Sequence, residues 1–371
     1  MEISAVGSLT TQVLWAGFIL SIFFGAIAQR SHFCTMGAVS DIVTMGDWTR
    51  MRMWGMAIGV AMIGFAALVA AGQIDPAKTL YASSRLIWLS ALVGGAMFGF
   101  GMVLASGCGS KTLVRVGGGS LKSLVVFIVM GVAAFATLKG ITAVVRVATV
   151  DRVAFDFSTQ AALPNWVAGA IGMAPATAGL ALALLIGLGL LFWALSGSGF
   201  LGFNNLLGGL GTGAVITAMW WVSGHLGHVA EHPETLQEAF LATNSGRAEA
   251  LSFVAPLAYT LDWLMFFSDK SKVLTLGIVS VFGVVAGSAL VAIVSRSFHW
   301  EGFRDAKDTA NHLVGATLMG VGGVVAMGCT VGQGLSGIST LSAMSFIAVG
   351  AIIAGATAGL RFQVWRLERA L

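Results

Sequence analysis

Long apolar stretches separated by short polar segments run along almost the whole chain. Stretches of about 18–22 apolar residues have the length of a helix that crosses a bilayer, whereas a membrane β-barrel shows short alternating segments. The pattern predicts an all-α polytopic membrane protein with polar connectors at 139–165 and 223–250. The expected spans are 12–28, 54–71, 86–106, 121–138, 176–195, one ending at Trp220-Trp221, 250–267, 273–294, 312–327 and 342–360.

Composition supports this class. Hydrophobic residues make up 57% of the 371 residues and charged residues only 10%, and the mean hydropathy is +0.90, whereas soluble domains carry roughly 25% charged residues. The net charge of +4 comes without a basic run, so we expect no nucleic-acid partner. The N-terminus lacks the basic region of a signal peptide, so we expect an uncleaved first span.

A motif repeats at an offset of 221 residues. Gly99-x-Gly101-x5-Gly107-Cys108 returns as Gly320-x-Gly322-x5-Gly328-Cys329, and six of the ten positions are identical. Internal two-fold repeats are typical of transporter folds. We therefore expect a single transmembrane domain over 1–371, built from two pseudo-symmetric halves at about 1–160 and about 176–371. The same offset pairs Asp41 with Asp262, which we expect to place negative charge at helix N-termini.

Each of the three cysteines lies where an apolar helix gives way to a polar or glycine-rich segment. Backbone at membrane depth must be hydrogen-bonded, buried in protein or facing a watery cavity. The pattern therefore predicts short half-helices around glycine–cysteine breaks, with free backbone N–H groups that face an anion at 117–119 and 332–334. The glycines expected to form these breaks are Gly107, Gly109, Gly328, Gly332 and Gly334.

The residues near the breaks favour a small sulfur-containing anion as the substrate. A thiol is a weak donor and its sulfur a polarisable acceptor, although a single membrane cysteine is more often a small hydrophobic residue. Lys111 and Arg115 either attract the anion or mark the membrane surface, and Arg30 has the same two interpretations. The predicted substrate pathway comprises Cys34, Cys108, Cys329, Lys111, Ser110, Gln333 and Arg30.

Three histidines, His225, His228 and His232, have a helical spacing that could bind a metal. They lie in the polar connector beside Glu231 and Glu234, so a solvated interfacial helix is the favoured interpretation. We predict no metal, no cofactor and no catalytic residue. The odd number of cysteines also argues against a disulfide framework.

The cysteine motifs resemble those of the YeeE/YedE family of thiosulfate and sulfur-compound transporters. The resemblance is carried by residues 30–41 (RSHFCTMGAVSD), 99–109 and 320–334. It implies an hourglass of spanning helices and half-helices in which Cys34, Cys108 and Cys329 line the waist and pass thiosulfate through S–H···S hydrogen bonds. It also implies a multi-pass protein of the bacterial plasma (inner) membrane, in contact with lipid, and a small cytosolic sulfurtransferase-like (TusA-like) partner.

Three functional hypotheses follow. The first is an uptake transporter for thiosulfate or a closely related anion, which is not an enzyme. The second is a membrane-embedded sulfurtransferase or thiol oxidoreductase that carries sulfur as a cysteine persulfide and needs a low-pKa thiolate. The third is a transporter for another oxyanion, such as sulfate, with purely structural cysteines.

Overall fold

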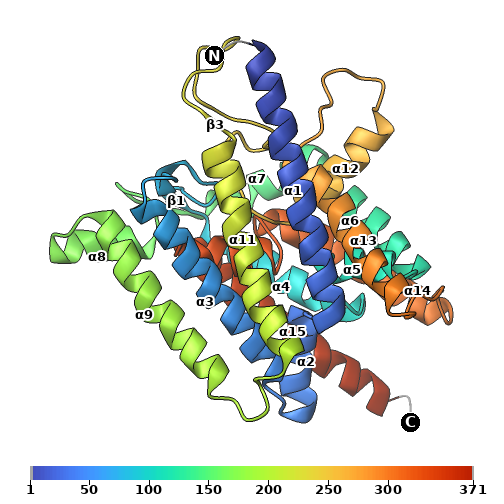
Figure 1. Cartoon of the computed structure of the whole chain (residues 1–371). Coiled ribbons are helices and arrows are strands. Elements are labelled where there is room, and N and C mark those ends of the chain that lie inside the picture. Colours follow the sequence, from blue (N-terminus) through green and yellow to red (C-terminus); the bar gives the residue numbers. More distant parts are fainter. Residues whose placement is uncertain (1–2, 370–371) are drawn as a thin grey trace.

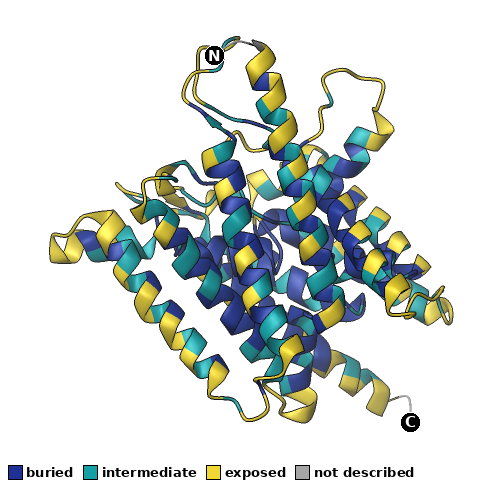
Figure 2. Cartoon of the chain, viewed as in Figure 1, coloured by how far each residue is buried: buried dark blue, intermediate teal, exposed yellow. Residues whose placement is uncertain are grey.

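The computed structural model describes residues 3–369 and is built almost entirely from helices (Figure 1). Eight helices in the described part of the chain are long and apolar enough to cross a membrane. Burial is concentrated where the helices meet at the centre, and the outward faces remain exposed and apolar (Figure 2). This confirms the prediction of an all-α polytopic membrane protein.

The N-terminal part alternates long helices with two short ones. The short helix α2 begins at Cys34, whose sulfur accepts the Gly37 N–H at 3.4 Å, and it ends at Gly46 with φ of 70°. The second short helix, α5, follows Cys108 directly. The elements are α1 Ile3–Ser31, α2 Thr35–Met45, α3 Thr49–Ala70, α4 Trp88–Leu104, α5 Gly109–Gly117 and α6 Leu121–Lys139.

The segment that follows α6 lies mostly at the surface, as its mixed polarity predicts. Strands β1 and β2 pair antiparallel, with Arg85 opposite Asp156, and α9 packs mainly on α3 and α8. Helix α8 was not expected from the sequence. The elements of this segment are α7 Ile141–Ala148, η2 Val150–Arg152, β2 Phe155–Asp156, α8 Leu163–Ile171 and α9 Pro175–Leu195. The loop between α3 and α4 contributes η1 Pro76–Lys78 and β1 Arg85–Leu86.

The C-terminal part repeats the alternation of long and short helices. A continuous helical segment covers 203–226 with two π-helical turns, and another π-helical turn, η5, follows Cys329. The elements are α10 Phe203–Leu206, η3 Leu207–Gly211, α11 Thr212–Trp221, η4 Val222–Leu226, β3 His228–Val229, β4 Ala239–Phe240, α12 Ala255–Met265, α13 Leu276–Val294, α14 Ala306–Val325, η5 Gly332–Gly337 and α15 Ala343–Glu368.

Two expectations for this part are wrong. The span expected at 250–267 is only the 11-residue helix α12, because the chain before it is extended and Pro256 lies in its first turn, where proline starts a helix rather than continuing one. The interfacial helix expected for the histidine connector is also not formed, because only His225 lies in a helical turn, η4, and the chain leaves the helix after Leu226. Strands β3 and β4 form a hairpin in which His228 lies opposite Phe240 and bonds to Glu238 at 2.6 Å.

The two glycine-rich helices α4 and α14 pack antiparallel through four glycines related by the repeat. A Cβ on Gly94 would lie 2.7 Å from the Gly322 carbonyl oxygen, and one on Gly322 would lie 2.6 Å from that of Gly94. Gly101 and Gly315 meet in the same reciprocal way, at 2.7 and 2.6 Å. Since the 221-residue offset maps Gly94 to Gly315 and Gly101 to Gly322, these contacts have the form of an inverted repeat about a local two-fold axis. The boundaries of the two halves stay a prediction.

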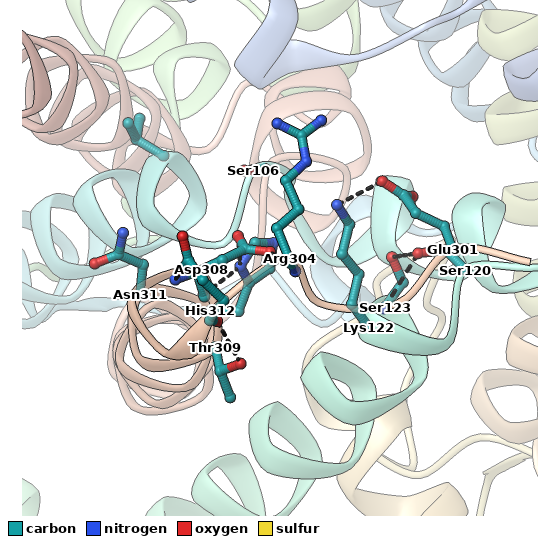
Figure 3. Close-up of polar contacts among 12 residues, drawn as sticks. Ser106, Ser120, Lys122, Ser123, Glu301, Arg304, Asp308, Thr309, Asn311 and His312 are labelled. Carbon is teal, nitrogen blue, oxygen red and sulfur yellow. Dashed lines mark hydrogen bonds and ion pairs between the residues drawn. The ribbon is translucent and has the colours of Figure 1, made fainter.

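A charged loop between α13 and α14 closes over the end of α5. The Glu301 N–H donates to the Gly119 carbonyl, and the Leu121 N–H donates to the Glu301 carbonyl. Figure 3 shows the Lys122 side chain reaching the Glu301 carboxylate, at 2.5 Å. The loop therefore holds the turn between α5 and α6 in place, and with it the half-helix that follows Cys108.

Candidate functional site

Cys34 and Cys108 come together although 74 residues separate them in the sequence. Their thiols lie close enough together to interact directly, and both are buried. The Cys108 sulfur also lies 3.3 Å from the Ser110 hydroxyl. Each cysteine directly precedes a short half-helix, so the helical path is interrupted at the thiol and the thiol does not lie in the middle of a helix.

Cys329 continues this chain of sulfur atoms. It is close enough to Cys108 for the two thiols to interact electrostatically, and the next residue, Thr330, faces Cys108. The Cys329 sulfur accepts the Gly332 N–H at 3.4 Å, and the backbone N–H groups of Phe253 and Val331 face it. The three predicted pathway cysteines therefore lie in one continuous group at the centre of the molecule.

A basic cavity of about 230 Å³ leads to Cys34 on one side of this group. We call it the vestibule. Four of its side chains carry or can carry positive charge: His32, Arg50, Lys111 and Arg115. Among the described residues that line it, none is acidic. An anion that enters the vestibule meets only positive or neutral groups before it reaches the first thiol.

Two further cavities lie on the opposite side of the thiols. The first, of about 410 Å³, is lined by Glu249, Ser252 and Gly328, and we call it the acidic cavity. The second, of about 200 Å³, is lined by Tyr81, Arg85 and Gln333. Both include Ile87 at the start of α4, whereas the vestibule includes Ser106 just after its end. Helix α4 has 17 residues, so the two sides are separated by roughly 26 Å along its axis.

The breaks before Cys108 and Cys329 have the same backbone geometry. Ser106 and Met327, which the 221-residue offset relates, have φ angles of 56° and 54°. In each case this residue and the next donate N–H groups to carbonyls of the last helical turn, which terminates the helix. Ser106 lines the vestibule and Met327 lines both opposite cavities. Because α4 and α14 pack antiparallel, the end of α4 lies at the vestibule and the end of α14 lies at the cavities on the opposite side of the thiols.

The glycine runs differ in part from expectation. The N–H groups of Gly118 and Gly119 bond to the Val114 and Val116 carbonyls and so are not free for an anion. The Gly332 N–H is directed to the Cys329 sulfur. Gly332 and Gly334 are required by close packing and not by anion binding. A Cβ on Gly332 would lie 2.6 Å from the Ser252 side chain, and a Cβ on Gly334 would lie 2.8 Å from the Trp54 side chain.

The other three glycines at the breaks are Gly107, Gly109 and Gly328, and they differ in the space around them. A Cβ on Gly107 would lie 3.3 Å from the Lys111 side chain, and one on Gly328 would lie 3.0 Å from the Gln333 side chain. Gly109, which starts α5, has ordinary space around it. These contacts place Lys111 and Gln333 directly against the breaks that precede Cys108 and Cys329.

The polar residues predicted for the pathway have different roles in the structure. Gln333 donates to the Ala326 carbonyl at 2.7 Å and accepts the Ser345 hydroxyl at 2.6 Å, so its amide holds the broken end of α14 in place. Arg115 lines the vestibule and donates to the Ser106 carbonyl at 2.7 Å. Arg30 is exposed near the end of α1 and is not among the residues that line the vestibule.

Asp41 and Asp262 do not serve helix N-termini as expected. Both lie in the second half of their short helices and form ion pairs with cations beyond the helix end: Asp41 with Arg50 at 3.3 Å, and Asp262 with Lys272 at 2.6 Å. The repeat therefore conserves the geometry of an ion pair, and in the N-terminal half this pair positions a cation that lines the vestibule.

Sequence reasoning missed two residues of the site. Arg50 lines the vestibule from α3, and no sequence motif links it to Cys34. The Thr330 hydroxyl is 1% exposed, faces Cys108 and has no geometrically complete hydrogen bond among the described residues. Buried polar groups without a partner are uncommon in folded proteins, so this hydroxyl is available to a ligand. Its position directly after Cys329 in the repeated motif was the signal that could have identified it.

Comparisons with known proteins identify relatives of this chain. The chain is 27% identical over 337 residues to the "Thiosulfate transporter TsuA" of Escherichia coli (strain K12), covering 87% of each chain. It is 26% identical over 355 residues to the "Thiosulfate transporter TsuA" of Spirochaeta thermophila, covering 91% of this chain and 94% of the relative. A shorter match, 28% identical over 104 residues, is to the "Probable transporter YedE" of E. coli (strain K12), covering 28% of this chain and 24% of the relative. The family model described as "Sulphur transport" matches residues 30–358, so the chain belongs to this YeeE/YedE family of membrane transport proteins.

Proposed function

We propose that the protein takes up thiosulfate, or a closely related sulfur anion, across the bacterial inner membrane along its three thiols. The observation that carries the proposal is the continuous contact from the basic vestibule through Cys34 and Cys108 to Cys329 and the cavities beyond. The thiosulfate transporters among its relatives support the choice of anion.

The chemistry of the path fits an anion that carries sulfur. An ion at membrane depth costs at least about 2.5–3.5 kcal/mol on insertion scales. Hydrogen bonds to a charged partner contribute about 1.5–3 kcal/mol each, and the S–H groups, the Ser110 hydroxyl and the Thr330 hydroxyl lie together at the thiols. Two or three such bonds offset the cost of bringing the anion to the waist, while Lys111 and Arg115 attract it into the vestibule.

Burial argues against covalent sulfur transfer as the main activity. Cys34 is 9% exposed, Cys108 is 1% exposed and Cys329 is fully buried. A sulfurtransferase must present its persulfide to an acceptor, whereas hydrogen-bonded passage only needs room for the anion to move between neighbouring thiols. A TusA-like acceptor of the delivered anion would act after transport, on the exit side.

Uptake of radiolabelled thiosulfate tests the proposal. Cells without an uptake system of their own receive wild type or a Cys34→Ala, Cys108→Ala or Cys329→Ala variant at matched membrane expression. We expect uptake by wild type that excess sulfate does not abolish, and strong loss in every variant. Absence of uptake by wild type would reject thiosulfate as the substrate, and normal uptake by the variants would show that the cysteines only pack.

A further inference from the structure

The acidic cavity contains a carboxyl group that anion transport does not use. Glu249 lines this cavity together with Ser252 and Gly328, the residue before Cys329. The same chain segment continues to Phe253, whose backbone N–H faces the Cys329 sulfur. Four residues of extended chain span at most about 14 Å. An acidic side chain is therefore held close to the last thiol on a path that we propose for an anion.

The carboxyl of Glu249 has hydrogen-bond partners but no ion pair among the described residues. It accepts the Ser245 hydroxyl at 2.9 Å and the Asn244 N–H at 3.4 Å. Arg146 is the one cation among the described residues that line the cavity, and it is paired with Asp151 at 3.3 Å. No positive charge that faces the cavity is left to neutralise Glu249.

Other groups around the cavity are neutral or directed elsewhere. Tyr259 of α12 lines the cavity and Tyr81 lines the neighbouring one, and each is close enough to Glu249 for a negative charge there to raise the pKa of its phenol. Arg247 donates to the Ala82 carbonyl at 2.8 Å. Burial raises the pKa of Glu249 to about 7, although the bonds from Ser245 and Asn244 act in the opposite direction. The group therefore exchanges a proton near neutral pH.

We propose that Glu249 is the proton-binding site of this transporter, and that a proton crosses the membrane with the sulfur anion. The inference rests on the proposed transport of a sulfur dianion. Thiosulfate is fully ionised at neutral pH, so the protein itself must carry the proton. The proton reaches Glu249 from the vestibule side along the neighbouring thiols while the anion is held at Cys329, and one O–H bond forms on the carboxylate. That bond breaks when the anion leaves, and the proton is released into the acidic cavity.

Electrostatics couple the two ligands. The Tyr81 side chain lies within electrostatic range of both Cys329 and Glu249. An anion at Cys329 favours the neutral, protonated form of Glu249, and by linkage a protonated Glu249 favours anion binding to the same extent. Coupling to a proton also favours uptake, because the proton cancels one of the two negative charges of the anion. Each negative charge that is not cancelled lowers the equilibrium concentration of the anion inside about fiftyfold for every 100 mV of inside-negative membrane potential.

Purified protein in vesicles tests the inference. The vesicles contain the pH dye pyranine, the voltage is clamped to zero with potassium and valinomycin, and labelled thiosulfate is added outside at equal pH. We expect internal acidification with wild type, at about one proton per thiosulfate. Wild type that moves thiosulfate without acidification would overturn the inference, whereas wild type that moves no thiosulfate would instead contradict the proposed function.

Variants separate proton binding from structure. Glu249→Gln keeps one oxygen that accepts the Asn244 N–H, and its NH2 group donates to the Ser245 hydroxyl instead of accepting from it. We therefore expect the variant to fold and to exchange labelled for unlabelled thiosulfate across the vesicle membrane without acidification. Glu238→Gln is the matched control, because Glu238 pairs with Lys78 at the surface outside the cavity, and it keeps the wild-type proton ratio. Acidification by Glu249→Gln, or loss of its exchange while it remains folded, would show that Glu249 is not the proton site.

Discussion

Thr330 allows a substitution with opposite effects on stability and transport. Its hydroxyl is buried, faces Cys108 and has no complete hydrogen bond among the described residues. Thr330→Val keeps the shape of the side chain and removes the hydroxyl. A buried polar group without a partner costs about 1–3 kcal/mol, so we expect the variant to be more stable by about 1 kcal/mol. For a chain of this size that corresponds to a rise in Tm of about 1–2 °C.

Transport changes in the opposite direction if the hydroxyl contacts the anion. A hydrogen bond to a charged group contributes about 1.5–3 kcal/mol, and each 1.36 kcal/mol is a factor of ten. Thr330→Val should therefore lower the initial uptake rate at low thiosulfate by about 10–150-fold. Uptake is measured with radiolabel at matched expression, and Tm with purified protein in detergent.

Thr212 is the matched control. Its hydroxyl is also buried without a hydrogen-bond partner among the described residues, and it does not line the vestibule or the opposite cavities. Thr212→Val should raise Tm by a similar amount and leave uptake unchanged. If Thr330→Val transports at the wild-type rate, or if both variants lose transport equally, the assignment of Thr330 to the path is refuted.

Three further predictions concern the vestibule, the helix contact and the charged loop. Lys111→Gln should raise the KM for thiosulfate uptake about tenfold or more, whereas Lys139→Gln, an exposed charge at the end of α6, should not; equal KM values would contradict a role for the vestibule charge. Gly101→Val should abolish the folded protein, seen as loss of the monodisperse peak in size-exclusion chromatography, because its Cβ would lie 2.7 Å from a backbone carbonyl of α14; a normal peak would refute the packing. Burial raises the pKa of Glu301, but the bond and positive charge of Lys122, the Ser120 hydroxyl and the Arg115 charge together lower it below its usual value. The attachment of its loop should therefore weaken as pH falls through the lowered pKa, measured as faster proteolysis of the loop; pH-independent cleavage would contradict this.

The sequence predicts the parts of this structure that depend on hydrophobic length and local chain geometry. The long helices follow from apolar runs, and the breaks at Cys34, Cys108 and Cys329 follow from glycine and polar residues next to them. The inverted contact between α4 and α14 could not be predicted, because a repeated motif does not state in which direction its copies cross the membrane.

Contacts between distant segments account for what the sequence did not reveal. Arg50 reaches the vestibule because Asp41 pairs with it, and no local pattern encodes that pair. The short helix α12 looked like a span because the residues around it are apolar, although part of that segment packs as extended chain in the core. The glycines at 117–119 looked free because sequence does not show which carbonyls accept their N–H groups.

The central claim is that the thiols pass an intact anion and do not transfer sulfur covalently. The most direct test is transport into vesicles of thiosulfate labelled with heavy sulfur at its terminal atom and heavy oxygen on its sulfonate, followed by mass spectrometry of the vesicle contents. The account predicts that both labels arrive inside in the same molecule. Arrival of the terminal sulfur alone, with labelled sulfite left outside and a persulfide on Cys34, Cys108 or Cys329, would contradict it.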